Sequence, residues 1–420
     1  MPESMLDVAA SLLVLTALLA AVNQRVLRLP PTIGLMATAL VLSLALVGLD
    51  AVGLAAGLHD RESALLGAID FSNLLMQGML SLLLFAGALH VDAAALRAYR
   101  WQVGLLAFAG TAVSTAVVGL GVWWLLGFAG LPLPLAHCLL FGALVSPTDP
   151  IAVLGILKSA GAPRNLEVVI AGESLFNDGV GVVLFTLLLG MHASGALPTF
   201  GEGTLLLLRE AGGGLLGGWL LGTATRALLR RLEHPSVAVM ITLAAVVGGY
   251  ALAARLDVSG PLAMVVAGLV VGHATRRQAI AVPVRQHLDM FWQVVDELLN
   301  AVLFVLVGME VVAVRFPMSM PMAVTAGVVA VVVTLVARVL SVGVPVALFR
   351  DAFRLPSGAG RVLVWGGLRG GLSIAMALSL PPDASRETLI ALTYCVVAFS
   401  ILVQGLTFSA LVRATRLPQA

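Results

Sequence analysis

Charged residues stand inside apolar segments long enough to cross a membrane, among them Asp149, Glu173, Asp178 and Arg369. A charge at mid-membrane costs roughly 2.5–3.5 kcal/mol on insertion scales, and such residues usually line a substrate or ion pathway. Most other acidic residues of the chain fall between the apolar segments or at their ends. These four residues are therefore the first candidates for chemistry.

The segment GESLFNDG at 172–179 carries polar residues at helical spacing. Ser174 and Asp178 are four residues apart and share one helix face, and Glu173 and Asn177 share the next face. A carboxylate beside a hydroxyl and an amide suits a weakly held monovalent cation, because hard cations prefer oxygen ligands. The alternative is that Asp178 only forms an ion pair within a helix bundle.

Two prolines flank Thr148 and Asp149 in the sequence SPTDP at 146–150. Each proline removes a backbone donor, so the helix is predicted to break in mid-span. Irregular backbone at that depth is tolerated only where it lines a protein cavity, and its freed carbonyls can coordinate a cation. The alternative is a kink that serves packing alone.

Four glycines surround Arg369 in the sequence WGGLRGG at 365–371. This pattern predicts a second helix break or a very close helix crossing, with a buried partner for the arginine. Glu173 is the predicted partner, because Asp178 must stay free to titrate if it forms a site. Glycine-rich segments also serve as packing faces, but packing does not explain the arginine.

The composition defines the elements that must position these residues. Of 420 residues, 60% are hydrophobic and 11% are charged, against about 25% charged in a soluble domain. The apolar runs are continuous, which excludes an outer-membrane barrel with its alternating pattern. Cys138 and Cys395 lie in apolar runs and imply no disulfide framework. The chain is predicted to be an all-α polytopic membrane protein, with the first apolar stretch retained rather than cleaved.

Hydropathy predicts thirteen spans joined by short loops, in one membrane domain over 1–420 without a soluble regulatory domain. They lie near 6–22, 32–49, 70–91, 101–127, 133–157, 165–190, 203–225, 235–254, 259–274, 290–313, 319–349, 359–380 and 387–412. If spans 1–6 and 8–13 form an inverted repeat, the fifth span corresponds to the twelfth. These two carry the strongest breaking signals, and such paired interruptions point to a transporter's binding site.

The basic residues predict the orientation in the membrane. Seventeen of the 24 Lys and Arg fall in loops on one side and five on the other. Positive charge favours the cytoplasmic side. The C-terminus is therefore predicted in the cytoplasm and, with an odd number of spans, the N-terminus outside.

The motifs resemble the NhaP/NHE-type branch of the monovalent cation:proton antiporters. They are SPTDPIAVLGIL at 146–157, GESLFNDGVGVVLF at 172–185, FWQVVDELLNAVLFVLVGME at 291–310 and GGLRGGLSIAMALSLP at 366–381. The resemblance implies an inverted-repeat fold in which two broken helices cross at the site. It also implies a homodimer, with an interface part near 1–95 and 200–315 and a core transport part near 100–192 and 319–413.

The same resemblance implies roles for individual residues. Asp178 would take either the cation or the proton, Ser174 and Thr148 would be further ligands, and Asp149 would belong to the same binding set. Asn177 would stabilise the site, and an Asn at this position goes with electroneutral one-for-one exchange. Glu173 and Arg369 would form an ion pair that holds the two regions together.

One position departs from the family pattern. Ala86 stands in the third span where several relatives place a glutamate. His90 and Asp92 follow toward the cytoplasmic end and are interpreted as interfacial residues rather than substitutes. The missing acid leaves open which monovalent cation is carried.

Several other polar residues receive only secondary interpretations. His137 and His192 are expected at the outer interface, where either could tune a pH response. Arg338 is expected to snorkel or to pair at a helix contact. On span ten, Asp296 and Glu297 would concentrate cations in a cytoplasmic funnel, with Asn300 deeper as a polar helix contact.

The predicted function is exchange of Na⁺ or Li⁺ for H⁺ by a secondary transporter of the plasma (inner) membrane, with no enzyme activity, cofactor or nucleic-acid partner. K⁺/H⁺ exchange is the alternative that Ala86 raises. An ion channel is disfavoured because no repeated filter loop is present. An intramembrane serine protease is disfavoured because Phe176 replaces the last glycine of G-x-S-x-G.

Overall fold

The computed structural model describes residues 5–51, 74–194, 200–276, 280–310, 318–353 and 355–415. Within these ranges all regular structure is helical. Long apolar runs favour this outcome, because a helix satisfies its backbone polar groups internally where lipid offers no partner. The prediction of an all-helical chain is confirmed. Of the basic residues counted for orientation, five lie outside the described ranges: Arg61, Arg277, Arg315, Arg354 and Arg416.

Each predicted span falls on a helical segment of the described ranges. Seven segments are long and apolar enough to cross a membrane: Ala9–Leu27, Arg100–Phe128, Arg164–His192, Pro235–Arg255, Val282–Glu310, Met320–Leu348 and Arg386–Ala414. Four shorter apolar helices are Pro31–Leu46, Leu74–His90, Leu135–Val145 and Gly260–Arg276. The two predicted spans that remain, 203–225 and 359–380, fall on α12 with α13 and on α20 with α21.

The helices used below have the following bounds. Those around the rim are α1 (Met5–Val22), α2 (Pro31–Ala51), α5 (Leu80–His90), α12 (Phe200–Leu207), α13 (Gly213–Leu229), α14 (Pro235–Arg255), α15 (Gly260–Arg276) and α16 (Val282–Glu310). The others are α6 (Ala93–Ala98), α8 (Thr111–Phe128), α9 (Leu135–Val145), α10 (Ile151–Ser159), α11 (Arg164–Ser194), α17 (Met320–Arg338), α18 (Val344–Leu348), α20 (Ala359–Trp365), α21 (Gly371–Leu378), α22 (Arg386–Phe399) and α23 (Leu406–Ala414).

Both predicted helix breaks are present. The fifth span stops at Val145 and resumes at Ile151, and the twelfth stops at Trp365 and resumes at Gly371. The two unwound segments cross and touch, because the backbone N–H of Asp149 donates to the Leu368 carbonyl over 2.8 Å. The motifs flagged in the sequence are thereby brought to one point.

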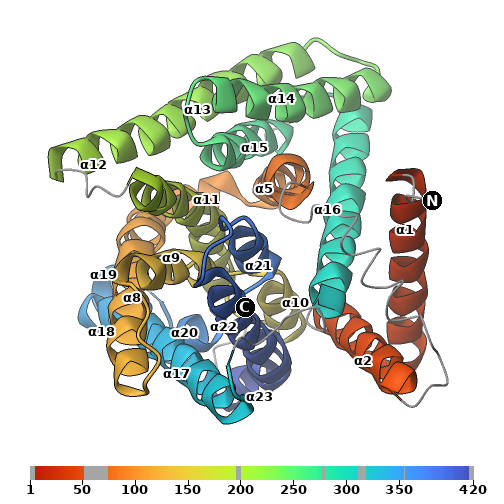
Figure 1. The fold of residues 1–420 in the computed structure, drawn as a ribbon. Coiled ribbons are helices and arrows are strands. Elements are labelled where there is room, and N and C mark those ends of the chain that lie inside the picture. The colour runs from red at the N-terminus through yellow and green to blue at the C-terminus, as the bar shows by residue number, and fades with distance from the viewer. Residues whose placement is uncertain are drawn as a thin grey trace.

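The helices form two groups around this crossing (Figure 1). The broken helices, α8, α11, α17 and α22 lie together, and α9 packs against both α8 and α11. The rim helices α13, α14, α15 and α5 lie along one side, and α16 and α2 pack together along another. The crossing of the two unwound segments therefore lies inside the first group of helices, and the second group lies next to it.

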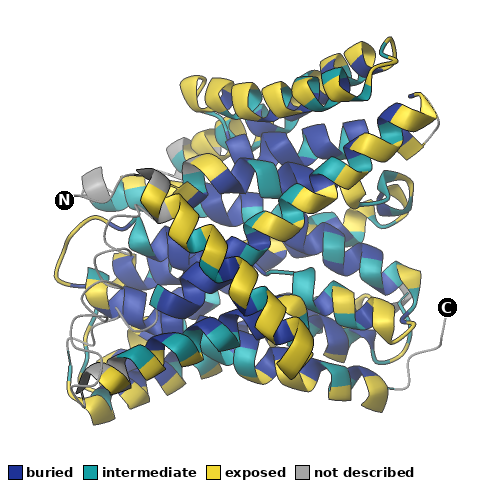
Figure 2. Cartoon of the chain, turned by 90° about the vertical axis from the view of Figure 1, so that its right-hand side faces the viewer, coloured by how far each residue is buried: buried dark blue, intermediate teal, exposed yellow. Residues whose placement is uncertain are grey.

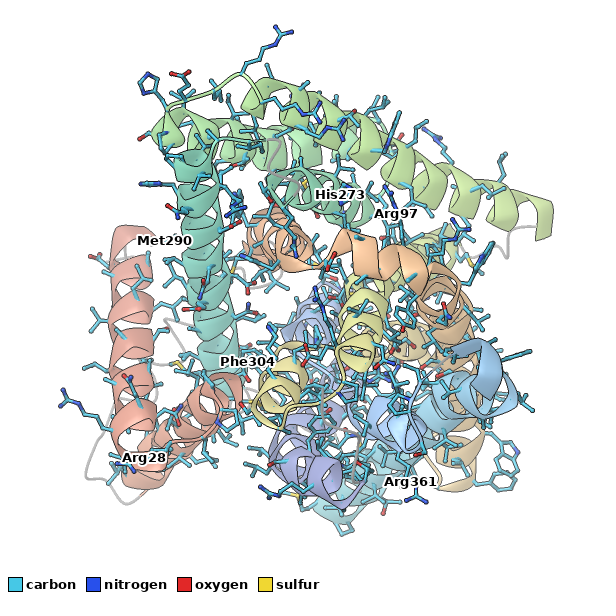
Figure 3. All side chains as sticks on the ribbon, turned by 180° about the vertical axis from the view of Figure 1, so that it is seen from behind. Arg28, Arg97, His273, Met290, Phe304 and Arg361 are labelled. Atoms are coloured by element: carbon cyan, nitrogen blue, oxygen red, sulfur yellow. The ribbon has the colours of Figure 1, made fainter. Side chains whose placement is uncertain are left out.

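Burial follows the same arrangement. Buried residues fill the centre and exposed residues follow the outer helix faces (Figure 2). Many of these exposed residues are large and apolar, including Trp101 at 78% and Trp124 at 59% exposure. Helix α16 shows the contrast along its length, with Met290 turned outward and Phe304 buried (Figure 3). Apolar outer faces suit lipid, which replaces water as the surrounding solvent.

Candidate functional site

Arg369 is the residue that holds the two unwound segments together. Its guanidinium donates to the carbonyls of Ser146 and Pro147, the latter at 2.8 Å, and its backbone N–H donates to Ser400 Oγ at 2.8 Å. The end of a helix leaves carbonyls without intrahelical partners. The positive charge of Arg369 satisfies those carbonyls where α9 breaks.

Glu173 pairs with Arg338 of α17, so the predicted ion pair between Glu173 and Arg369 is wrong. Both terminal guanidinium nitrogens of Arg338 donate to the carboxylate, the second at 3.2 Å, and that second nitrogen also donates to the Leu363 carbonyl at 3.0 Å. The two side chains are 1% and 8% exposed. Arg369 finds backbone partners instead, because it emerges beside freed carbonyls. The sequence signal for this pair was Arg338, a second arginine within an apolar span.

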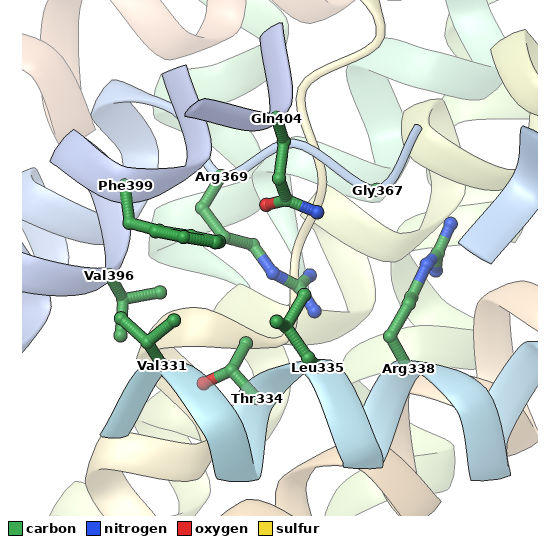
Figure 4. A pocket seen from close by; sticks show the side chains of 9 residues that line it. All are labelled: Val331, Thr334, Leu335, Arg338, Gly367, Arg369, Val396, Phe399 and Gln404. Atoms are coloured by element: carbon green, nitrogen blue, oxygen red, sulfur yellow. The ribbon is translucent and has the colours of Figure 1, made fainter. Parts of the chain in front are cut away.

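The two arginines lie on opposite sides of a small internal cavity (Figure 4). Gln404 and Thr334 also line this cavity of about 10 Å³, a volume that holds about one water molecule. A side chain on Gly367 would lie 2.3 Å from Arg338 Nε. This glycine of the WGGLRGG motif is therefore required for the arginine to pass the unwound segment.

Asn177 fastens the first unwound segment to α11. Its amide nitrogen donates to Thr148 Oγ1 at 2.8 Å, and its amide oxygen accepts from the Thr148 backbone N–H at 3.2 Å. The hydroxyls of Thr148 and Ser174 lie 3.0 Å apart. All three side chains are buried. The structure thus brings together three of the predicted site residues, with Asn177 in a positioning role.

Asp149 and Asp178 face a cavity of about 750 Å³ that ends at the crossing. Asp149 Oδ1 accepts the backbone N–H of Ile151 at 2.9 Å, so this carboxylate satisfies the first N–H group of α10. A Cβ on Gly370 would lie 2.6 Å from Asp149 Oδ2, so the second unwound segment needs glycine here. Asp178 enters the same cavity from α11. The two predicted carboxylates therefore share one space that reaches the surface.

Helix α16 supplies polar groups on the other wall of this cavity. Asp296 and Glu297, the acids predicted near a funnel, line it, and so does Asn300, which was predicted as a polar helix contact. The Asn300 amide donates to Asp296 Oδ1 at 3.0 Å and to the Asp296 carbonyl at 2.8 Å. Asp296 is thereby held in place on the wall that faces Asp149 and Asp178.

The mouth of the cavity carries both signs of charge. Arg164 and Asp92 form an ion pair at 2.6 Å, and Lys158 and Arg276 line the cavity beside them. The backbone N–H groups of Ala95 and Ala94, with the nearby arginines, hold the pKa of Asp92 below its ordinary value. Asp92 is thus an anion that begins helix α6.

The position of the missing acid is filled by packing. Ala86 is fully buried in α5, and its carbonyl lies 2.8 Å from a ring nitrogen of His90.

One polar residue that the sequence reasoning missed is Ser373 of α21. It is 1% exposed, lines the cavity, and makes no side-chain hydrogen bond in the described part of the chain. Its only sequence signal is its place two residues after the second break.

Known proteins match this chain over nearly its whole length. The family model described as "Sodium/hydrogen exchanger, transmembrane" matches residues 13–414. The Na⁺/H⁺ antiporter NhaP of Pseudomonas aeruginosa is 49% identical over 413 residues, covering 97% of this chain and 96% of that protein. The Na⁺/H⁺ antiporter NhaH of Halobacillus dabanensis is 33% identical, covering 97% and 98%. The structure of the sodium proton antiporter MjNhaP1 from Methanocaldococcus jannaschii has the same fold, with a TM-score of 0.76 at 17% identity, covering 98% and 99% of the two chains.

Proposed function

The chain belongs to the sodium/hydrogen exchanger family, and from that premise we propose that it exchanges Na⁺ for H⁺ through competition at Asp178. It is a secondary transporter and not an enzyme. Ala86 raised K⁺ as an alternative cation. The two relatives above that are at least 33% identical over nearly the whole chain are both named Na⁺/H⁺ antiporters, which favours sodium.

The observation that carries this proposal is the position of Asp178. It lies inside the bundle at the end of a cavity of about 750 Å³, next to the crossing of the two unwound segments. A carboxylate there can be reached by ions from the mouth while it lacks the hydration of bulk water. Loss of hydration favours neutralisation by either a proton or a cation, which is the basis of competition.

Oxygen atoms for a bare monovalent cation are present beside Asp178. Thr148 and Ser174 offer hydroxyls, and the unwound segment offers the backbone carbonyls of Thr148 and Asp149, because those of Ser146 and Pro147 already accept from Arg369. Asn177 fixes Thr148 from two sides and keeps these oxygens in place. Asn177 carries no charge and so adds no exchangeable proton next to Asp178, which supports electroneutral exchange.

Coupling follows from the cost of moving an empty carboxylate. A charged Asp178 that crosses an apolar barrier would lose its solvation without compensation. Movement then occurs only when a proton or a cation neutralises the site. The moving part would be the core near 100–192 and 319–413, against the interface part near 1–95 and 200–315. The cavity supports this division, because Asp178 lines one wall and Asp296 of α16 lines the other.

The basic residues at the cavity mouth support an inward-facing state. Lys158, Arg164 and Arg276 line the mouth and belong to the loops that the charge bias assigns to the cytoplasm. In this orientation the N-terminus lies outside and the C-terminus in the cytoplasm. We expect the protein to act as a homodimer in the cell membrane and to serve pH homeostasis.

The test is a ΔpH-dequenching assay in inside-out vesicles, with Na⁺, Li⁺ or K⁺ added at several values between about pH 6 and 9. Wild type should respond to Na⁺ and Li⁺, and Asp178→Asn should give no response while folding normally. A response to K⁺ alone would change the substrate and keep the mechanism. Wild-type exchange by Asp178→Asn would overturn the proposal.

A further inference from the structure

Two histidines and an aspartate meet at the far end of α11 from the cavity mouth. This helix runs from Arg164 at the mouth, past Asp178, to His192 in its last turn. His137 stands in the first turn of α9, and Asp383 lies in the loop between α21 and α22. One ligand atom from each of the three residues lies within 4.8 Å of the other two. Three elements that are distant in sequence thus converge on one point.

The distances show that the carboxylate is the centre of the cluster. Nε2 of His137 lies 2.7 Å and Nε2 of His192 lies 3.4 Å from the same oxygen, Oδ2 of Asp383. The two imidazole rings meet edge to face with centroids 4.5 Å apart. From the sequence, both histidines are predicted to lie at the outer interface, and no contact between them is predicted. In the structure His137 is buried, and the two rings are in contact.

Asp383 is fixed in a geometry that leaves Oδ2 for the imidazoles. Its other oxygen accepts the backbone N–H groups of Ser385 and Arg386 at 2.9 and 2.8 Å. The Arg386 guanidinium donates to the Leu378 and Leu380 carbonyls, so it is engaged elsewhere. Burial raises the pKa of Asp383, but hydrogen bonds from His137 and the backbone outweigh it and keep the pKa below its ordinary value. The carboxylate is therefore anionic at neutral pH.

We propose that His137, His192 and Asp383 bind a divalent transition-metal ion of the Zn²⁺ class, with water in the fourth position. Imidazole nitrogens and a carboxylate oxygen are ordinary ligands of such ions. Bonds of about 2.0–2.1 Å in tetrahedral geometry place ligand atoms roughly 3.3 Å apart. The separation between His192 and Asp383 already matches, and that between His137 and Asp383 must widen by roughly half an ångström as the ion replaces their hydrogen bond.

A bound ion would join the start of one broken helix to the end of the other. His137 opens α9, and Asp383 follows α21 by five residues. All three ligands belong to the core part described above, so occupancy stabilises the crossing and leaves the core free to move. This last consequence rests on the proposed function, whereas metal binding itself does not.

The surroundings of His137 set the expected strength of binding. Its Nδ1 is buried and makes no hydrogen bond within the described ranges. Metal-bound histidines usually donate this second nitrogen to an acceptor that strengthens the site. Affinity should therefore be lower than in structural zinc sites.

Binding is measured on the purified, tag-free full chain in detergent. Co²⁺ is added first, its visible absorption bands report tetrahedral coordination, and Zn²⁺ is then used to displace it. His192→Ala and Asp383→Asn should each bind roughly tenfold or more weakly. His287→Ala is the matched control, because that exposed histidine of α16 bonds only to the Pro283 carbonyl in the described part of the chain. The control should bind like wild type.

Zn²⁺ should also raise the unfolding temperature of wild type and of His287→Ala, but not that of Asp383→Asn, because the ion binds only the folded site. His137→Ala is less suitable as the decisive variant, since this buried residue can affect folding. Failure of wild type to bind either ion, or wild-type binding by His192→Ala and Asp383→Asn, would overturn the proposal. Asp178→Asn should still bind the metal, which separates failure of this site from failure of the transport mechanism.

Discussion

Glu173 and Asp178 lie five residues apart on the same helix, yet the fold treats them in opposite ways. Glu173 is 1% exposed and held by both nitrogens of Arg338. Asp178 faces a wide cavity that reaches the surface. Glu173 has a fixed partner and cannot be reached by ions from the surface. Asp178 can be reached through the cavity, which has space for an exchangeable ion.

This contrast separates a structural carboxylate from a transporting one by environment rather than by residue type. A buried ion pair joined by two hydrogen bonds has no reason to exchange its partner, and removal of one partner leaves an uncompensated charge. A carboxylate at the end of a cavity can lose and regain its partner at low cost. Matched substitutions at the two positions should therefore have opposite effects.

The largest expected effect is on transport at Asp178. Asp178→Asn removes the only exchangeable charge in the proposed mechanism, so Na⁺-driven proton movement should fall to the level of empty vesicles. Asparagine has nearly the same shape, and the unfolding temperature should remain close to that of wild type. Exchange is measured in vesicles and unfolding in detergent on the same preparation. Residual exchange above background would move the site away from Asp178.

The next effect concerns stability at the Glu173 pair. Glu173→Gln keeps the shape but leaves Arg338 as an unpaired buried charge, which typically costs about 3–5 kcal/mol. The yield of folded protein and its unfolding temperature should fall, while exchange per folded molecule persists. The double variant Glu173→Leu with Arg338→Met should recover most of the stability, because replacing a whole buried pair by apolar residues is often neutral. Lack of recovery would show that the pair has a role beyond charge balance.

This pair also shows where sequence reasoning succeeded and where it stopped. Breaks at SPTDP and GGLRG could be predicted, because proline and glycine act on the local backbone wherever the helix lies. The partner of Glu173 could not be predicted, because two arginines within spans were available and the choice depends on how α17 packs. Likewise, no local pattern joins His137 to Asp383, which lie 246 residues apart. That Ser373 faces the cavity also depends on tertiary packing, so no local pattern in the sequence predicts it.

A smaller effect is expected at Asn177, which lies on α11 between the two carboxylates. Asn177→Ala removes both hydrogen bonds to Thr148 and leaves a buried backbone N–H without a partner, which costs about 1–3 kcal/mol. Because Thr148 is then less fixed, apparent affinity for Na⁺ should weaken more than the maximal rate. A sodium titration of the dequenching signal separates the two quantities. An unchanged affinity for Na⁺ would remove Asn177 from the positioning role.

The smallest effect is expected at Asp92, a third carboxylate that lies at the cavity mouth and begins α6. Its side chain accepts the backbone N–H groups of Ala94 and Ala95 and pairs with a mostly exposed Arg164. Asp92 therefore has fixed partners, as Glu173 does, but it is also accessible from the surface, as Asp178 is. Asp92→Ala should cost about 1 kcal/mol through loss of the helix cap, and Asp92→Asn should cost less because asparagine also caps.

The pH dependence of this contribution has a definite sign. The pKa of Asp92 is lower in the folded protein than its ordinary 3.8, so its stabilising effect is complete above about pH 5 and is lost as the pH falls through the folded value. The difference in unfolding temperature between wild type and Asp92→Ala should therefore stay constant from neutral pH to about pH 5 and shrink below that. A difference that grew on acidification would mean that the carboxylate is not the group that stabilises the mouth.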